Sequence, residues 1–463
     1  MQHLLRTSLL KLAFVLAFIL SAFSARAQAP VDSGAREIVF RSVNVVPMNK
    51  EEVLRNQDVV VRDGKITAIG NAGKVKYGSG ALVIEGEGKY LMPGLAEMHA
   101  HVPPVDDLEP MERIVRLFAL KGITTIRGML GHPRHLQLRS MIEQGELLSP
   151  RFYTSGPSLN GNSVQSPEQG AEMVRQQKQA GYDFLKLHPG LTPETFGAIA
   201  QTANETGIPF AGHVSYEVGV WRAIDAGYAS IDHMDGFIES LVPNLNSIPE
   251  QQAGLFAMFI ADQADTSRIP KLVNALREHN IWVVPTQALA ERWMAPDKDP
   301  DELAQAPEMK YINPEALSNW VATKKKLMAQ PQYDPAAIAR YLQLRRKLIY
   351  ESHKNGVGLL LGSDAPQVFN VPGFSTHQEL QYLVDAGLTP YEALRTGTVN
   401  VGRYLNRPDI GVIQTGAAAD LILISGNPLQ DVKATQNIEG VLVGKRWLPK
   451  EYIAQELKKL EKR

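Results

Sequence analysis

The 463-residue sequence contains no cysteine. This absence excludes disulfides, thiolate metal ligands and a lipid-modified N-terminal cysteine, so a transition metal would have to be held by histidine, carboxylate or a less common ligand. Charge of either sign is also not in excess, because the formal net charge is −1. Nothing suggests the basic patch of a nucleic-acid-binding protein, so we predict no nucleic-acid partner. Beyond the N-terminal region, no apolar run is long enough to span a bilayer.

The N-terminal region has the pattern of an export signal. Arg6 and Lys11 supply positive charge, residues 12–20 are an unbroken apolar run, and Ala25-Arg26-Ala27 is a small-x-small cleavage site. We predict a signal peptide over residues 1–27 and an exported protein, periplasmic or secreted, with no stable membrane span after cleavage. The alternative is a membrane anchor, which would need about 20 apolar residues. Without residues 1–27 the chain has 45 basic and 49 acidic residues, a net charge of −4.

Apolar β-type segments occur near both ends of the remaining chain. Residues 38–46 and 58–69 are rich in Val and Ile, and Asp63-Gly64 divides the second segment as a hairpin turn would. Residues 419–424 and 438–443 repeat this texture. We predict that the two ends pair into one small β-module. The expected domains, in chain order, are a signal peptide (1–27), the first part of the β-module (28–90), the barrel (91–405), the second part of the β-module (406–450) and a helical tail (451–463).

Between these ends, short apolar strands alternate with longer helical stretches such as 111–121, 193–206 and 336–355. Eight such units predict the α/β class and a (β/α)8 TIM barrel. Residues 237–278 and 288–334 are longer than a connection needs, so we expect insertions over the active-site face; the tail 452–463 is a Lys-rich amphipathic helix. The expected barrel strands are 91–99, 124–127, 152–155, 184–187, 209–213, 230–233, 282–286 and 359–364.

Metal-competent side chains fall at the ends of five of these strands, and four of the eleven histidines in the chain are among them. Catalytic residues of TIM barrels gather where the strands end. The H-x-H spacing places two imidazoles on the same side of a strand, because side chains alternate along it. The predicted metal ligands are His99, His101, Lys186, His213, His233 and Asp364.

Two of these side chains have alternative explanations. Lys186 lies in the apolar run Phe-Leu-Lys-Leu and would be a snorkelling or salt-bridged lysine in an ordinary protein. Desolvation lowers the pKa of a lysine, and a neutral amine can take up CO2 to form a carbamate that bridges two cations. Asp364 would otherwise be a helix N-cap. At a strand end it can ligate a metal, accept a proton from metal-activated water and pass it to the leaving group.

Residues 93–101, Pro-Gly-Leu-Ala-Glu-Met-His-Ala-His, resemble the signature of the amidohydrolase superfamily. The chain is more closely similar to its imidazolonepropionase-like and prolidase-like (Xaa-Pro dipeptidase-type) branch. This resemblance implies a (β/α)8 barrel with a β-sandwich-like side module, two zinc-type cations, a carboxylated Lys186, and hydrolysis of amides such as dipeptides. Further matching stretches are 124–127, 182–186, 212–215, 226–233, 361–364 and 418–422.

The chain departs from the family pattern at three positions. Glu97 stands where Asp is usual two residues before the first histidine, Gly128 stands where Asp commonly follows the Thr-Thr-x-Arg motif, and His188 is an unusually bulky neighbour of Lys186. None of these departures removes a ligand, but each bears on substrate specificity. His188 is therefore a candidate substrate contact.

Two further side chains are candidate substrate contacts with equally good structural explanations. Arg127 can hold a substrate carboxylate bidentately or stabilise the barrel beneath its rim. Tyr216 can donate a hydrogen bond to the substrate or be an ordinary rim tyrosine. Surface positions are expected for His132 and His135, and structural roles for His377 and Glu379.

We predict a binuclear metal-dependent hydrolase of carbon–nitrogen bonds, which cleaves a dipeptide or N-acyl amino acid by metal-activated hydroxide. One alternative is a mononuclear deaminase or cyclic-amide (imidazolone-type) hydrolase on the same fold; a bridging Lys186 would have no purpose there. The other is a non-catalytic binding protein, against which the intact ligand set argues. The expected partner is a small-molecule or short-peptide substrate, with monomer and homo-oligomer both open. The expected cofactors are two divalent ions, zinc above all for imidazole and carboxylate donors.

Overall fold

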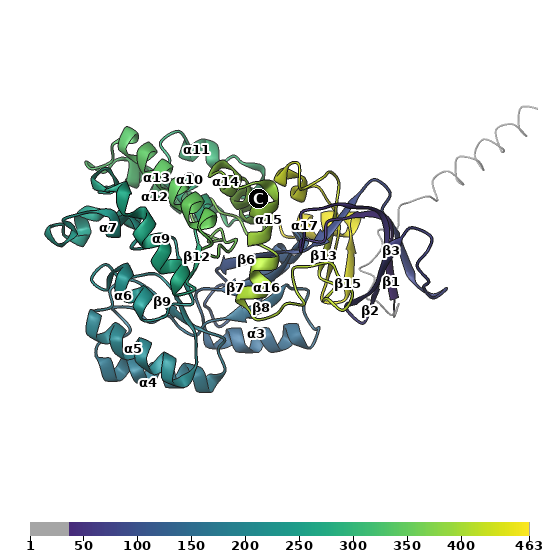
Figure 1. Cartoon of the computed structure of the whole chain (residues 1–463), viewed down its shortest axis with the longest axis horizontal. Coiled ribbons are helices and arrows are strands. Elements are labelled where there is room, and N and C mark those ends of the chain that lie inside the picture. Colours follow the sequence, from purple (N-terminus) through teal and green to yellow (C-terminus); the bar gives the residue numbers. More distant parts are fainter. Residues whose placement is uncertain (1–36, 463) are drawn as a thin grey trace, which may run out of the picture.

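The computed structural model describes residues 37–462, so the predicted signal peptide lies outside the described residues. A mixed β-sheet occupies one end of the molecule, and parallel strands with surrounding helices form the rest (Figure 1). The predicted α/β class is confirmed. No helix over residues 37–462 is long and apolar enough to cross a membrane.

The mixed sheet contains strands from both ends of the described chain. Its strand order is β15-β14-β13-β5-β1-β2-β3, with β4 paired to β1. The antiparallel β13–β5 pair joins the late strands to the early ones, and Phe40 packs edge-on against Trp447 with ring centroids 5.3 Å apart. The predicted pairing of the two ends is therefore confirmed. The strands are β1 (Glu37–Val45), β2 (Leu54–Arg62), β3 (Lys65–Asn71), β4 (Leu82–Glu85), β5 (Tyr90–Pro93), β13 (Leu421–Ile424), β14 (Ile438–Val443) and β15 (Arg446–Pro449).

The hairpin turn between β2 and β3 is the one that the sequence predicts. Asp63 and Gly64 have φ angles of 48° and 77°. Two successive left-handed residues are the geometry of a type I′ turn, which aspartate and glycine adopt most readily.

Two parallel sheets form the second part of the molecule, in the orders β6-β7-β8 and β12-β11-β10-β9. Parallel bridges join β8 to β9 through Ser155 and Phe184, and β12 to the segment 359–365 through Val283 and Leu359. That segment pairs in turn with β6, because Met98 donates its N–H to Leu361. The last segment thus returns to the first strand. The strands are β6 (Leu95–Ala100), β7 (Ile123–Gly128), β8 (Arg151–Thr154), β9 (Leu185–Leu187), β10 (Phe210–Gly212), β11 (Ser230–Asp232) and β12 (Trp282–Val284).

Two of the predicted strands differ from the structure. The expected first strand, 91–99, is divided at Gly94 into β5, which joins the mixed sheet, and β6, which joins the parallel one. A Cβ at Gly94 would lie 2.2 Å from the Thr124 side chain, so only glycine allows this close crossing. The expected eighth strand, 359–364, is bridged to β12 at Leu359 but does not form a regular strand, and its last residue, Asp364, has a left-handed φ of 64°.

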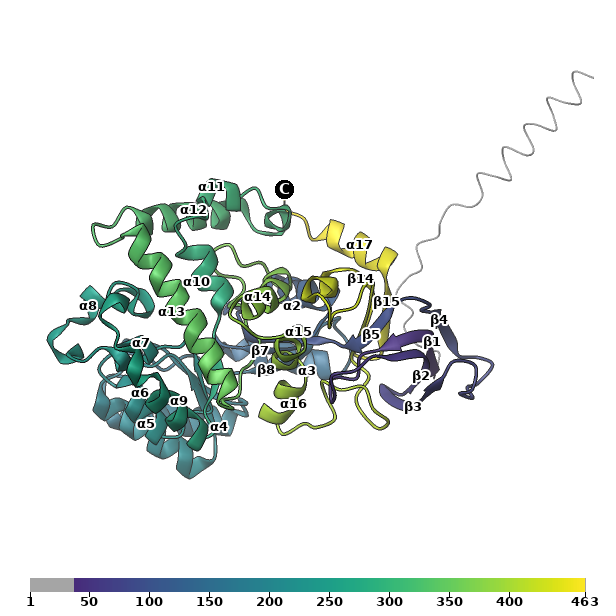
Figure 2. The same cartoon turned by 45° about the horizontal axis from the view of Figure 1, so that its top comes forward.

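Helices follow most of the parallel strands and cover them on the outside (Figures 1 and 2). The predicted helix 193–206 coincides with α5, which begins at an N-cap threonine and ends at a left-handed glycine. The helices are α2 (Leu108–Leu120), α3 (Pro133–Glu143), α4 (Pro167–Ala180), α5 (Pro193–Thr206), α6 (Gly219–Asp225), α7 (Phe237–Leu241), α8 (Glu250–Ala253), α9 (Ile269–Glu278), α10 (Gln287–Trp293), α11 (Pro300–Leu303), α12 (Pro314–Met328), α13 (Pro335–Lys354), α14 (Phe374–Asp385), α15 (Pro390–Thr396), α16 (Val399–Tyr404) and α17 (Lys450–Lys459).

The two long connections are not structureless. Residues 237–278 form α7, α8, α9 and four short 3-10 turns, and residues 288–334 form most of α10 together with α11 and α12. The C-terminal tail is helical as predicted, in α17. The domain boundaries given above stay predictions.

Candidate metal centre

The carboxyl ends of the parallel strands bring the predicted ligands together. The Nε2 atom of His101 lies 2.7 Å from Oδ1 of Asp364, and Nε2 of His99 lies 3.6 Å from the same oxygen. The Lys186 amine is 3.5 Å from Nε2 of His99. The ring of His233 is 4.4 Å from that of His99. Parallel strands in register explain this convergence, because their ends meet on one face.

His213 completes the group from the end of β10. Its ring stacks on that of His233, with centroids 4.4 Å apart and planes 27° from parallel. The structure therefore brings all six predicted ligands into one cluster. His99, Lys186, His233 and Asp364 are buried, and His101 and His213 are half-buried.

Three of the histidines have a side-chain oxygen at Nδ1. Asp232 lies 2.9 Å from His99 and Asp235 lies 2.7 Å from His213. Thr286 is 2.9 Å from Nδ1 of His233. Such partners fix the orientation of an imidazole and leave Nε2 for a metal. None of these three side chains carries a signal in the sequence, although Asp232 and Asp235 flank a predicted ligand.

The electrostatics of the cluster favour neutral imidazoles. Burial, followed by the nearby Lys186 amine, holds the pKa values of His99 and His213 well below the usual range. Burial and the neighbouring histidines do the same for the pKa of His233. A neutral imidazole is the form that binds a metal.

The donor set fits a metal ion. Ligand atoms of His99, His233 and Asp364 all lie within 4.8 Å of one another. Nε2 of His233 is buried without a hydrogen-bond partner, and Nε2 of His101 and Oδ1 of Asp364, although 2.7 Å apart, do not have the geometry of a hydrogen bond. Buried polar atoms are otherwise almost always satisfied, so a shared cation is the natural partner for these three.

Lys186 is completely buried in β9, and burial lowers its pKa to about 8. A lysine with this pKa carries an appreciable fraction of neutral amine near neutral pH. The lowered pKa is what carbamate formation requires. Gly212 on the neighbouring β10 makes room for the lysine stem, since a Cβ there would lie 2.8 Å from Cδ of Lys186.

Comparison with known proteins places these residues in a family. A model of the amidohydrolase family matches residues 90–448. The chain belongs to the amidohydrolase family. The predicted resemblance is confirmed, and because members of this family depend on metal ions, the His-His-Asp group is a candidate metal site of this amidohydrolase.

Similar proteins have several different activities. An ochratoxinase from Aspergillus niger is 23% identical over 459 aligned residues, which cover 84% of this chain and 82% of that protein. An adenine deaminase from Ruegeria sp. (strain TM1040) is 27% identical over 255 residues, 51% of this chain and 40% of its own. The solved structure of a Xaa-Pro dipeptidase with bound methionine has a TM-score of 0.65 at 19% identity, and the match covers 89% of this chain and 100% of that one.

Glu97 is a structural link within this amidohydrolase. Its buried carboxylate accepts hydrogen bonds from the backbone N–H groups of His99 and Ser363, and from the hydroxyls of Ser363 and Thr376. Burial raises its pKa to about 7. Since Ser363 directly precedes Asp364, Glu97 ties the H-x-H strand to the segment that carries this predicted ligand. The family's usual aspartate is one methylene shorter than this glutamate.

Arg127 lies beneath the cluster of predicted ligands and is 1% exposed. Its guanidinium donates to both oxygens of Asp232 at 3.1 and 3.2 Å, to the Tyr404 hydroxyl, to Ser230 and to the Met98 carbonyl. Every nitrogen has a protein acceptor. These contacts favour the structural explanation over binding of a substrate carboxylate.

The two other candidate substrate contacts have different surroundings. The His188 ring stacks on His213 with centroids 4.9 Å apart, and its buried Nδ1 has no hydrogen-bond partner. Tyr216 donates its hydroxyl to the Ile248 carbonyl in the connection that follows β11. Their roles toward a substrate stay predictions.

Four side chains that were set aside as surface or structural residues lie away from the cluster. His132 is half-buried, as a surface residue can be, and caps α3. His135 is completely buried, and its Nε2 lies 3.1 Å from the Pro103 carbonyl. The surface position expected for His135 was wrong because α3 packs onto β8. His377 lies between Thr435 and the Lys121 carbonyl. Glu379 accepts the first N–H groups of α10.

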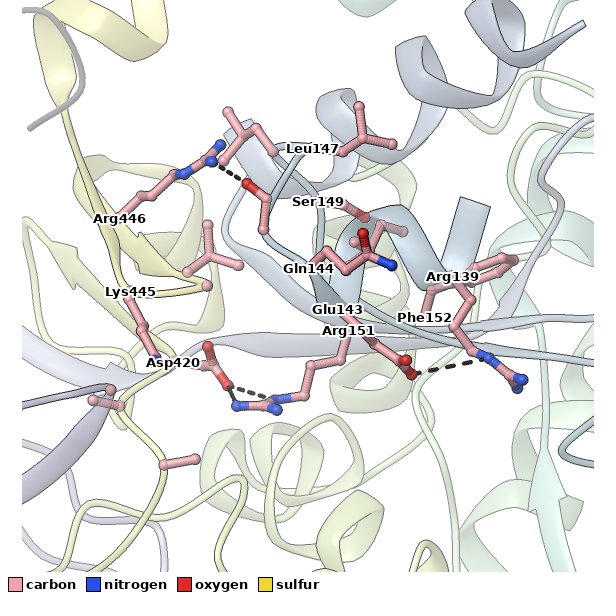
Figure 3. Close-up of a pocket in the computed structure, with 18 of the residues that line it drawn as sticks. Arg139, Glu143, Gln144, Leu147, Ser149, Arg151, Phe152, Asp420, Lys445 and Arg446 are labelled. Carbon is pink, nitrogen blue, oxygen red and sulfur yellow. Dashed lines mark hydrogen bonds and ion pairs between the residues drawn. The ribbon is translucent and has the colours of Figure 1, made fainter. Parts of the chain in front are cut away.

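A cavity of about 650 Å³ lies far from this chemistry, between the mixed sheet and α3 (Figure 3). Arg151, the first residue of β8, forms an ion pair with Asp420 there at 2.8 Å, and Arg139 pairs with Asp183 at 2.8 Å. The cavity lies at the amino end of β8, whereas the predicted ligands gather at the carboxyl ends of the strands.

Proposed function

We propose that the chain is an exported, binuclear metal-dependent amidohydrolase that cleaves an amide bond of a short peptide or N-acyl amino acid. The observation that carries this proposal is the convergence of His99, His101, His213, His233 and Asp364 around the buried Lys186 amine. The return of segment 359–365 to β6 supports a closed (β/α)8 barrel as the scaffold. The amide-hydrolysing relatives support the reaction class.

The protein's own residues would divide the work. The four histidines and Asp364 hold two divalent cations, zinc by the nature of the donors. When bound, these ions polarise a carbonyl and make a water molecule more acidic. Asp364 is suited to accept the proton of the attacking water at Oδ1, which has no hydrogen-bond partner, and to deliver it to the leaving nitrogen. Water and amide thus become acid and amine.

Lys186 is the proposed bridging ligand after N-carboxylation. Its amine lies in the middle of the cluster, 3.5 Å from Nε2 of His99 and away from water. A carbamate converts this cationic side chain into an anion with two oxygens. That change supplies charge for two cations where an ammonium group would repel them.

A second candidate function is mononuclear deamination or cyclic-amide hydrolysis on the same fold. The similarity to an adenine deaminase over 51% of the chain favours it. In that case one ion would occupy the site of His99, His233 and Asp364, and Lys186 would remain an amine. The two functions therefore differ in metal content.

The deciding experiment combines elemental analysis with a substrate panel. Protein purified without chelator should contain about two divalent ions per chain and hydrolyse dipeptides or N-acyl amino acids. Full activity with one firmly bound ion, together with turnover of adenine or a cyclic amide in place of the acyclic amides, would establish the second function. A mutant that lacks Asp364 serves as the control for contaminating peptidases.

Export and partners remain part of the proposal. The features of residues 1–27 support cleavage after Ala27 and a periplasmic or secreted location. The expected partner is the small-molecule or short-peptide substrate. Size-exclusion chromatography of the mature protein distinguishes a monomer from a homo-oligomer.

A further inference from the structure

The connection between β11 and α9 reaches back over the cluster of proposed ligands and places one aromatic ring, that of Phe256, against two of its histidines. Phe256 lies almost parallel to His233, with ring centroids 5.1 Å apart and planes 15° from parallel. The same ring is 6.4 Å from that of His213, at 12°. Together with the stacking of His188 on His213, four rings follow one another across the ligands. Phe256 thus faces the site from the side of the insertion.

The backbone at Phe256 is strained. Phe256 has φ 52° and ψ 34°, and Ala257 has φ 58°. Left-handed conformations are rare for residues other than glycine, and they gather at ligand clamps and active sites, where the surrounding structure holds them. Two successive left-handed residues, one of them aromatic, indicate that the surrounding structure holds the ring in place despite the unfavourable backbone energy.

The rest of the insertion provides that support. Gly254 has φ 73° and ψ 178°, and a Cβ there would lie 2.4 Å from the Phe259 ring. Phe259 donates its N–H to the Ala253 carbonyl, which closes the turn. Beyond the turn, Asp262 is anchored to Arg340 of α13 by an ion pair at 2.6 Å. The ring is therefore presented by a braced turn.

The cationic side chains beside the Phe256 ring have their hydrogen-bond donors occupied. The guanidinium of Arg345 lies 5.9 Å from the Phe256 ring and donates to the carbonyls of His233 and Pro285 and to Gln287. Arg127 is likewise occupied from below. The side of the cluster next to Phe256 thus presents an aromatic ring whose cationic neighbour, Arg345, has its donors occupied. A substrate group that is large and apolar suits it better than a charged one.

We infer that Phe256 is a specificity-determining residue, which packs against a large apolar, preferably planar, group beside the scissile amide. This inference rests on the proposed amide hydrolysis and narrows its substrate class. Packing of an aromatic group on an apolar wall changes selectivity by about tenfold to a few hundredfold. The ring acts on substrate binding, so its loss should appear in KM more than in kcat.

The test compares variants on a graded panel. N-acyl amino acids are prepared in which either the acyl group or the amino-acid side chain grows from methyl through isobutyl to benzyl. Phe256→Ala removes the ring, and Phe256→Leu keeps apolar bulk without a plane. Leu255→Ala is the matched control, because this exposed neighbour in the same turn has no ring contact with the histidines. Metal content and thermal unfolding are measured for each variant to verify an intact site.

Wild type should prefer the benzyl member in at least one series by about tenfold or more. Phe256→Ala should abolish that preference through KM, Phe256→Leu should retain part of it, and Leu255→Ala should match wild type. An equal loss on every member, or an unchanged preference in Phe256→Ala with full metal content, would overturn the role of Phe256 while leaving amide hydrolysis intact. If wild type with two metal ions cleaves no member, the proposed function itself fails, and this inference with it.

Discussion

Arg127 offers a decisive test of how the proposed metal ligands are held in place. The guanidinium donates to both oxygens of Asp232, and Asp232 in turn lies 2.9 Å from Nδ1 of His99. We consider Arg127→Met, which keeps an unbranched stem but removes the charge, and Asp232→Asn, which keeps the shape but removes the anion. If Arg127 acts through Asp232, both variants should disturb His99 although neither touches a metal.

The magnitudes follow from burial. Arg127 is 1% exposed and Asp232 is 0% exposed, so removal of either partner leaves an uncompensated charge in the interior. Such a loss costs about 3–5 kcal/mol of the free energy of unfolding. Loss of the carboxylate that orients a ligating histidine weakens metal binding by about 10–100-fold. The double variant, in which neither member of this pair is charged, should be less destabilised than the sum of the two single variants.

Urea unfolding of the metal-free protein and zinc titration with a competing chelator measure these two effects. Arg139→Met is the control, since its ion pair with Asp183 is partly exposed and should contribute at most about 1 kcal/mol. The reasoning is refuted if Arg127→Met unfolds like wild type and binds zinc normally while KM rises only for substrates with a carboxylate. Arg127 would then be the substrate-binding residue that its position in the motif also allowed.

Three further outcomes are expected. Lys186→Arg should lose both metal and activity, by roughly a thousandfold or more in rate, whereas acetate should partly restore Lys186→Ala; near-normal turnover of Lys186→Arg with two ions contradicts the bridge. Burial lowers the pKa of His377 to about 3, below its value of about 6.5 in an unfolded chain. The contribution of His377 to the free energy of unfolding is therefore complete above pH 6.5 and is lost as the pH falls toward 3, because the unfolded chain takes up the proton first. At about pH 5.5 the loss is about 1.4 kcal/mol, and His377→Gln should show a correspondingly smaller decrease in the free energy of unfolding between about pH 7.5 and 5.5; an equal decrease refutes the assignment. N-terminal sequencing of the exported protein should begin at Gln28, and an intact N-terminus in the membrane fraction would indicate an anchor.

Strand ends could be predicted from the sequence because each ligand stands in a short apolar run with a fixed period. His99 and His101 follow such a run at i and i+2, and His213 closes another; the structure brings both runs to the same face. The β-module could also be predicted, because the Asp63-Gly64 turn and the Val-rich segments carry local signals. These features depend on neighbours in the chain.

The supporting residues could not be found in this way. Asp232 reaches a histidine 133 positions earlier, Thr286 reaches His233, and Glu97 meets Ser363 where the last segment lies beside β6. No periodicity links such pairs, because they depend on the three-dimensional return of the last segment to the first strand. Phe256 carried no signal at all: it lies in an insertion whose length alone indicated a place near the active site.

The conformations of the ligands themselves explain why this supporting layer is needed. His233 and Asp364 both have left-handed backbones, with φ angles of 60° and 64°. Each such residue costs of the order of 1–3 kcal/mol unless the surroundings hold it. Arg345 binds the His233 carbonyl, and Glu97 binds the N–H of the residue before Asp364. These left-handed conformations turn both proposed ligands off their strands toward the proposed metal site, and the buried arginine and glutamate hold them in that orientation.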